Sequence, residues 1–277
     1  MGLMDVFWIL AHPDTRSLNG ALHRDGVAAL TGAGHHVEVS DLYAMKWDPV
    51  VDRDDFGSGD ERLRVGPASA RALKEGTLSP DIRAEQDKLG RADLVVMQFP
   101  LWWFGVPAIL KGWIDRVFVR DYAYSIPDPD WPGRSLRYGN GGLAGKRALA
   151  VVTIGADPEG YQPRGIEGSL ADLLFPLLHG TFFYTGMVPL PPVAVYGANH
   201  LSEADYRSAA AGLRSRLLAA ETAPPISYRP QNGGDYDDRM VLLAARGGRP
   251  DRAGRPPGMT PGTPAQQRAG QYGTIDR

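Results

Sequence analysis

The sequence predicts an α/β protein: a doubly wound, mostly parallel five-stranded sheet of strand order 2-1-3-4-5, with helices on both faces. Short unbroken apolar runs, typical of strands buried on both sides, alternate along the chain with segments of helical apolar periodicity. This alternation implies parallel strands joined by helices that cover both faces. Hydrophobic residues at 43% and charged residues at 22% allow a sizeable core.

The predicted elements begin with a βαβ unit. The apolar run 6–10 predicts a first strand, which ends at His12-Pro13. A helix follows, with Ser17 at its N-cap and the glycines of segment 32–34 at its end. The alternating segment 36–40 predicts the second strand.

The middle of the chain begins with an interruption. Residues 46–79 are polar and include an acidic stretch, so we expect a long surface excursion with a short helix at 68–73. The pattern then resumes with a helix at 79–89, a third strand at 93–99 and a helix at 107–118.

Four further elements complete the set. We expect a fourth strand at 147–154, a helix at 169–179 and an amphipathic helix at 202–218. Between these helices, residues 188–195 predict a fifth strand whose prolines suit a sheet edge.

Composition excludes several classes of function. Thirty basic against thirty-two acidic residues give a net charge of -2, which offers no general electrostatic reason for binding to nucleic acid or to an anionic membrane. The chain has no cysteine, which excludes disulfides, thiolate metal sites and a cysteine nucleophile. The apolar run 6–11 is too short to span a bilayer, and we expect a cytoplasmic protein without a metal site.

Two loops at predicted strand ends carry the candidate chemistry, because ligands of open α/β sheets sit there. The loop 12–20 leads into a helix N-terminus that suits a phosphate, with His12, Ser17 and Asn19 as side-chain donors. An ordinary capped helix is the alternative. In the second loop, the aromatic run 102–104 suits stacking on a planar ring, or else caps the core.

The stretch 98–118 closely resembles the signature of the NAD(P)H quinone dehydrogenase family, the DT-diaphorase-like flavoproteins with a flavodoxin-like fold. His12-Pro13, the segments 17–20 and 40–45, and Leu78-Ser-Pro-Asp-Ile82 match the same family in the same order. The resemblance covers about residues 5–220. It implies a homodimer that binds FAD, or alternatively FMN, and reduces quinones or similar planar acceptors by two electrons from NADH or NADPH in a ping-pong reaction.

The resemblance also implies which residues bind the flavin. The flavin's phosphate side would be held by the first loop, through His12, Ser17, Leu18 and Asn19, and its ring would lie along the second loop, at Pro100, Leu101, Trp102, Trp103 and Phe104. Its pyrimidine end would meet a third loop, made of Thr153, Ile154, Gly155 and Ala156. Its adenylate would lie near Arg207.

Tyr161 matches the family's active-site tyrosine and would contact the flavin and stabilise its reduced, anionic form. Glu167 stands where the family has a histidine, six residues beyond that tyrosine. An ionised glutamate adds negative charge where a histidine could become a cation, although Arg164 could supply positive charge instead. Tyr124 matches one aromatic residue of the family's acceptor pocket, and Ile126 replaces the second, which favours an altered substrate preference.

Alternative functions remain open at this stage. An azo- or nitro-reductase, or a pathway-specific FMN-dependent reductase, would use the same flavin site. Relatives of this fold also serve as ancillary regulatory flavoproteins of potassium efflux systems. We expect residues 1–220 to form the flavodoxin-like flavin-binding domain, 221–245 to form an extension that packs on the domain or on the partner, and the Arg/Gly/Pro-rich residues 246–277 to be disordered.

Overall fold

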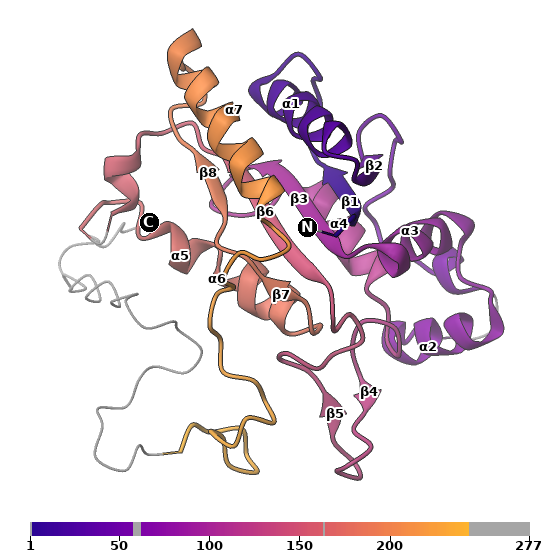
Figure 1. Ribbon diagram of the computed structural model, residues 1–277. Helices are drawn as coiled ribbons and strands as arrows, with labels where there is room; N and C mark the ends of the chain where they lie inside the picture. The colour runs from indigo at the N-terminus through magenta and orange to yellow at the C-terminus, as the bar shows by residue number, and fades with distance from the viewer. Residues whose placement is uncertain (1, 58–61, 163, 244–277) are drawn as a thin grey trace, which may run out of the picture.

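The computed structural model describes residues 2–57, 62–162 and 164–243 (Figure 1). Within these ranges, no helix has the length and apolarity needed to cross a membrane. In chain order, the elements are β1 (Asp5–Leu10), α1 (Leu18–Gly32), β2 (His36–Asp41), η1 (Asp54–Phe56), α2 (Val65–Glu75), α3 (Pro80–Arg91), β3 (Leu94–Pro100), α4 (Ala108–Val117), β4 (Ile126–Pro127), β5 (Ser135–Leu136), β6 (Arg147–Thr153), η2 (Pro158–Tyr161), α5 (Leu170–Leu173), α6 (Phe175–Leu177), the π-helix η3 (Leu178–Phe183), β7 (Val188–Pro189), β8 (Val193–Val195) and α7 (Glu203–Leu218).

One parallel sheet runs through the molecule in the order β2-β1-β3-β6, and both β7 and β8 pair with β6. The predicted last strand is therefore split in two, with Pro191-Pro192 between its halves. Proline has no N–H to donate to a strand ladder, so it interrupts the pairing at this edge. With β7 and β8 counted as one strand, the predicted order 2-1-3-4-5 is confirmed.

The two faces of the sheet bury separate cores, because successive side chains of β1 point to opposite sides. Val6 and Trp8 belong to the core that includes residues of α1 and α7, which lie side by side in Figure 1. Phe7 and Ile9 belong to the core that includes residues of α3 and α4. Each fully buried large apolar side chain contributes about 1.5–3 kcal/mol. The strand ends that hold the candidate loops are thus fixed from both sides.

The prediction that segment 46–79 is a surface excursion is wrong, because part of this segment is buried. Trp47, Phe56 and Leu78 are buried in the α3–α4 core. The predicted short helix at 68–73 is the longer helix α2. The apolar residues that anchor this segment are few and separated by polar ones, so its sequence shows no sustained periodicity.

A buried arginine ties this segment to α4. The Arg116 guanidinium donates from Nη2 to Asp55 Oδ1 at 2.5 Å and from Nη1 to Asp81 Oδ2 at 2.7 Å. Arg116 and Asp55 are 5% and 3% exposed, and the guanidinium lies over the Trp47 ring at 4.6 Å. Arg116 is therefore fully engaged in holding the fold.

The prediction of a single helix at 169–179 is also wrong. The structure has the short helices α5 and α6 followed by the π-helix η3. Pro176 lies at the start of α6, and its ring prevents a regular α-helix from continuing through this point.

A hairpin and the end of the described chain form a separate layer below the sheet in Figure 1. The hairpin pairs β4 with β5. The segment 226–243 starts beside β7, where Ile226 N donates to Pro189 O at 2.8 Å, and then passes the end of β5, where Gln231 N donates to Tyr138 O at 3.1 Å. The tail expected at 246–277 lies outside the described residues.

Candidate functional site

Loops at the carboxyl ends of the parallel strands enclose a cavity of about 440 Å³, which we call the strand-end cleft. This volume falls within the range of about 300–1,000 Å³ that is usual for small-molecule sites. The cleft is lined by His12, Ser17, Leu18, Asn19, Pro100, Leu101, Trp102, Thr153, Gly155, Ala198 and Asn199. The structure thus brings residues from all three predicted loops to one place.

The N-terminus of α1 points at the cleft with unpaired donors. Ser17 caps the helix by accepting a hydrogen bond from Gly20 N at 3.2 Å, and His12 Nδ1 lies 2.9 Å from Ser17 Oγ. The backbone N–H groups of Leu18 and Asn19 have no partner among the described residues, although Asn19 is only 2% exposed. A buried helix end with unpaired N–H groups fits an anion such as a phosphate.

A buried hydrogen-bond network fixes this helix end to the sheet. Asn19 Nδ2 donates to Thr153 Oγ1 at 2.7 Å, which joins the first loop to the third. Gln98 Nε2 donates to Asn19 O at 2.8 Å, and Gln98 Oε1 accepts from Trp8 Nε1 at 3.0 Å. Sequence reasoning missed Gln98, although it is the only polar side chain in the apolar strand β3. Such a buried polar group needs partners, and these partners set the shape of the cleft.

The second loop makes a tight turn that presents aromatic rings to the outside. Trp102 N and Gly105 O are 3.2 Å apart, and Gly105 N and Trp102 O are 3.0 Å apart. Trp103 and Phe104 both have left-handed backbone conformations, with φ of 50° and 59°, which costs about 1–3 kcal/mol for each residue. Trp103 is 98% exposed, so these rings do not cap the core. Exposed aromatic rings on such a strained turn, beside a cleft, are suited to stacking on a planar ligand.

The third loop divides between the cleft and the core. Thr153 and Gly155 line the cleft, whereas Ile154 is buried in the core and Ala156 is exposed outside the lining. Ala198 and Asn199, in the loop after β8, also line the cleft and were missed from the sequence. The rule that ligands sit at the carboxyl ends of strands would have found them, had it been applied to the last strand as well.

Tyr161 and Glu167 are neighbours in the loop after β6, and neither belongs to the lining of the strand-end cleft. Tyr161 is 8% exposed and packs on Tyr196, with ring centroids 5.6 Å apart. Glu167 N donates to Gly160 O at 3.1 Å, which folds the loop back toward the tyrosine. Burial, together with the charge of Glu167, raises the pKa of Tyr161. The phenol therefore stays protonated near neutral pH and can donate a hydrogen bond. Arg164 is exposed.

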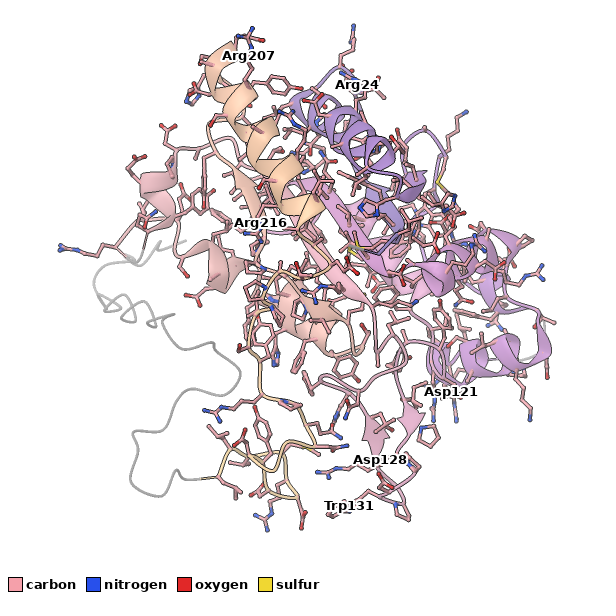
Figure 2. The ribbon with its side chains drawn as sticks, viewed as in Figure 1. Arg24, Asp121, Asp128, Trp131, Arg207 and Arg216 are labelled. Atoms are coloured by element: carbon pink, nitrogen blue, oxygen red, sulfur yellow. The ribbon has the colours of Figure 1, made fainter. Side chains whose placement is uncertain are left out.

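Arg207 lies away from the cleft lining, on the exposed side of α7 (Figure 2), where its Nε donates to Glu203 Oε1 at 3.0 Å. Its neighbours Asp205 and Ser208 line a second cavity of about 480 Å³. The loop after β8 lines both cavities, with residues 198–199 in the strand-end cleft and residues 197 and 200–201 in the second cavity.

The structure does not bring Tyr124 and Ile126 to the cleft of the same chain. Tyr124 is half-buried just before β4, where burial raises its pKa, and Ile126 belongs to β4. The hairpin residues Asp128 and Trp131 lie at the opposite end of the molecule from Arg207 in Figure 2. In the described part of the chain, no cluster of three metal-ligating side chains occurs.

Comparisons with known proteins agree with this geometry. A family profile described as flavodoxin-like fold matches residues 4–217. The ribosyldihydronicotinamide dehydrogenase-like protein traD of Penicillium crustosum is 46% identical over 88% of this chain and 92% of its own length. NAD(P)H dehydrogenase (quinone) 1 of Cavia porcellus is 37% identical over 85% of this chain and 84% of its own. A provisionally assigned quinone reductase from Klebsiella pneumoniae superposes with a TM-score of 0.84 at 45% identity, over 86% of this chain and 93% of its own.

Proposed function

Because the chain belongs to the flavodoxin-like family that includes the NAD(P)H quinone dehydrogenases, we propose that it is a flavin-dependent NAD(P)H oxidoreductase acting on quinones or similar planar acceptors. The observation that carries this proposal is the strand-end cleft, in which unpaired helix N–H groups face one part and an exposed aromatic turn borders another. When bound there, a flavin would supply two-electron hydride chemistry between a reduced nicotinamide and the acceptor. We place the activity in the cytoplasm, where reduced nicotinamides are available.

The residues present fit a flavin. The unpaired N–H groups of Leu18 and Asn19 would bind its phosphate, and Trp102 would lie against its ring. The choice of FAD over FMN is supported by the second cavity, which shares the loop after β8 with the cleft and gives space for an adenylate near Arg207. FMN would leave that cavity without a role.

Tyr161 would contribute a neutral donor at this site. Its pKa is raised, so the hydroxyl keeps its proton near neutral pH and can donate to an oxygen that becomes negative on reduction. Glu167, as an acceptor-only carboxylate when ionised, would not balance such a negative charge. Tyr161 thus stabilises the reduced state by donation, whereas Glu167 opposes it by charge.

We further propose a homodimer in which each chain completes the other's acceptor site. Neither Tyr124 nor Ile126 lines the strand-end cleft of its own chain, so we assign both residues to the acceptor site of the partner. A two-fold pairing would bring the hairpin of one chain to the cleft of the other. Light scattering during gel filtration would measure the mass. A monomer that is fully active would contradict this arrangement.

Steady-state turnover tests the proposed activity. Protein loaded with FAD or with FMN is mixed with NADH or NADPH, and nucleotide oxidation is followed with and without the quinone menadione. We expect oxidation that depends on the quinone and is supported by FAD, with parallel initial-rate plots typical of a ping-pong reaction. Absence of quinone-dependent oxidation with either flavin would reject the proposal and favour a regulatory flavoprotein instead.

A further inference from the structure

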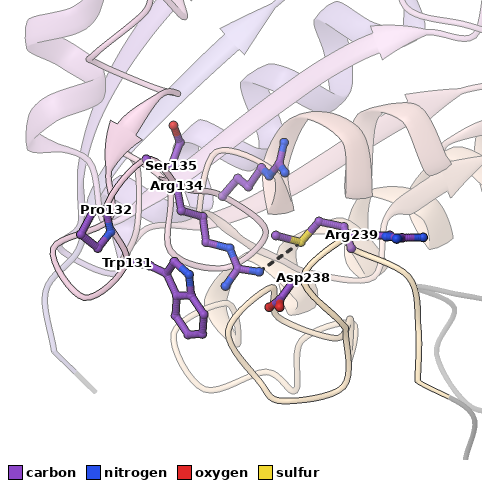
Figure 3. A pocket seen from close by; sticks show the side chains of 9 residues that line it. Trp131, Pro132, Arg134, Ser135, Asp238 and Arg239 are labelled. Carbon is purple, nitrogen blue, oxygen red and sulfur yellow. Dashed lines mark hydrogen bonds between the residues drawn. The ribbon is translucent and has the colours of Figure 1, made fainter.

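The hairpin and the C-terminal segment enclose two adjoining cavities that share no lining residue with the strand-end cleft. A cavity of about 310 Å³ is lined by Arg137, Tyr138, His179, Arg229, Gln231, Tyr236 and Met240. A more open one of about 580 Å³, drawn in Figure 3, is lined by Trp131, Pro132, Gly133, Arg134, Ser135, Arg137, Asp238, Arg239 and Met240. Arg137 and Met240 line both, so Arg137 stands where the two meet. We call the pair the arginine cavity.

Cationic side chains dominate this lining. Four arginines line the arginine cavity, against the single carboxylate of Asp238. Arg229 is paired with Asp235 at 3.1 Å, whereas Arg134 lies over the Trp131 ring at 4.9 Å and points its Nη2 at Met240 Sδ (Figure 3). A concave surface with this excess of positive charge attracts anions.

The guanidinium of Arg137 is held in place by a buried glutamine. Arg137 Nε donates to Gln231 Oε1 at 2.7 Å, and Gln231 Nε2 donates to Ser135 O at 3.1 Å. Gln231 is 4% exposed, and its own N–H donates to Tyr138 O at 3.1 Å. The two terminal nitrogens of Arg137 have no partner among the described residues. This leaves an oriented pair of N–H donors, the geometry that binds a carboxylate through two parallel hydrogen bonds.

Aromatic side chains form the wall next to this arginine. Tyr138 stacks on His179, with ring centroids 4.9 Å apart and an interplanar angle of 29°, and His179 continues the stack onto Phe175. Burial lowers the pKa of His179, so its ring is neutral near pH 7 and adds no charge. Tyr138 has a left-handed φ of 49°, a strained conformation at the cavity wall. A small planar ligand would find an apolar surface here.

We propose that the arginine cavity is a second ligand site that binds a small aromatic carboxylate, with the ring in the smaller cavity against Tyr138 and the carboxylate on the two terminal nitrogens of Arg137. The volume of the smaller cavity, about 310 Å³, suits a ligand of one or two rings. This inference does not rest on the proposed flavin chemistry, because no residue that lines the strand-end cleft of the same chain lines the arginine cavity.

Titration calorimetry on the flavin-loaded protein tests the site with 2-naphthoate and its neutral analogue 2-naphthamide. We expect naphthoate to bind at least about tenfold more tightly than the amide, since only the carboxylate makes charge-assisted bonds. Arg137→Gln should weaken naphthoate binding by about tenfold or more, and Arg137→Lys, which keeps the charge but not the paired donors, should weaken it less. Arg83→Gln, an exposed arginine of α3, is the matched control and should leave the affinity unchanged.

Three results would overturn the proposal. One is no naphthoate binding up to about 1 mM, which corresponds to roughly 4 kcal/mol of binding energy. The second is equal binding of acid and amide, which would mean stacking alone. The third is unchanged naphthoate affinity in Arg137→Gln, which would place the ligand elsewhere, for instance on the flavin. Thermal unfolding of each variant verifies that the fold is intact.

Discussion

The strand-end cleft and the arginine cavity are both concave surfaces with unpaired hydrogen-bond donors, but the donors are of different kinds. In the cleft, the donors are backbone N–H groups at a helix start, fixed by buried strands and by the Asn19–Thr153 hydrogen bond. In the arginine cavity, the donors are side-chain nitrogens oriented by the buried Gln231. Backbone donors come with the fold, whereas side-chain donors depend on individual residues. A fold-level likeness can therefore predict the first site and not the second.

The contrast between two arginines gives the largest expected effect. Arg116 is buried with Asp55 and Asp81, whereas Arg137 has no carboxylate partner among the described residues. We expect Arg116→Gln to lower the free energy of unfolding by about 3–5 kcal/mol, because two carboxylates lose their cation, one of them buried. Arg137→Gln should cost less than about 1 kcal/mol. Urea denaturation measures both, and equal losses would mean that Arg137 is a structural residue.

A pair of glycines tests how closely the cleft depends on backbone position. A Cβ on Gly20 would lie 1.9 Å from the carbonyl oxygen of Thr15, whereas a Cβ on Gly32 would meet nothing within 4 Å. Gly20→Ala should therefore displace the loop before α1, cost about 1–3 kcal/mol of stability and weaken flavin binding by about tenfold.

The matched control is Gly32→Ala near the end of the same helix. This change should leave flavin affinity unchanged and add up to about 1 kcal/mol of stability, because alanine favours the helix. Fluorescence titration with FAD gives the affinities, and chemical denaturation gives the stabilities. Equal flavin affinity in the two variants would mean that the N-terminus of α1 does not hold the phosphate.

The smallest expected effect concerns the charge beside Tyr161. Burial is the main cause of its raised pKa and the charge of Glu167 is the second, so Glu167→Gln should lower the pKa of Tyr161 toward its ordinary value. Glu167→His should also raise kcat/KM for quinone reduction by about threefold to tenfold below pH ~6.5, where imidazole is a cation, and this gain should fade as the pH rises.

The glutamine variant separates charge removal from charge reversal. Its rate should lie between those of the wild type and the histidine variant, without a pH dependence near neutrality, because an amide does not titrate. If kcat/KM in the histidine variant neither rises nor changes with pH, then Glu167 does not oppose the reduced state.

How much the sequence could predict depends on the kind of signal. The buried strands β1 and β3 are continuous apolar runs, and the run of aromatic residues after β3 has no helical period, so the sheet order and the three loops could be predicted. Gln98 was missed because it is a lone polar residue in an apolar strand, with partners distant in sequence. Asn199 was missed because the rule that ligands sit at strand ends was not applied to the last strand. Arg137 gives no signal at all: its role depends on Gln231, 94 residues away.

An anaerobic titration of the purified, flavin-loaded protein, followed by its absorption spectrum, tests the proposed oxidoreductase function most directly. We expect NADH or NADPH to bleach the flavin band and an added quinone to restore it, with FAD as the flavin released on denaturation. A bound flavin that neither nucleotide bleaches would contradict the proposed oxidoreductase function and point to a regulatory role for the strand-end cleft.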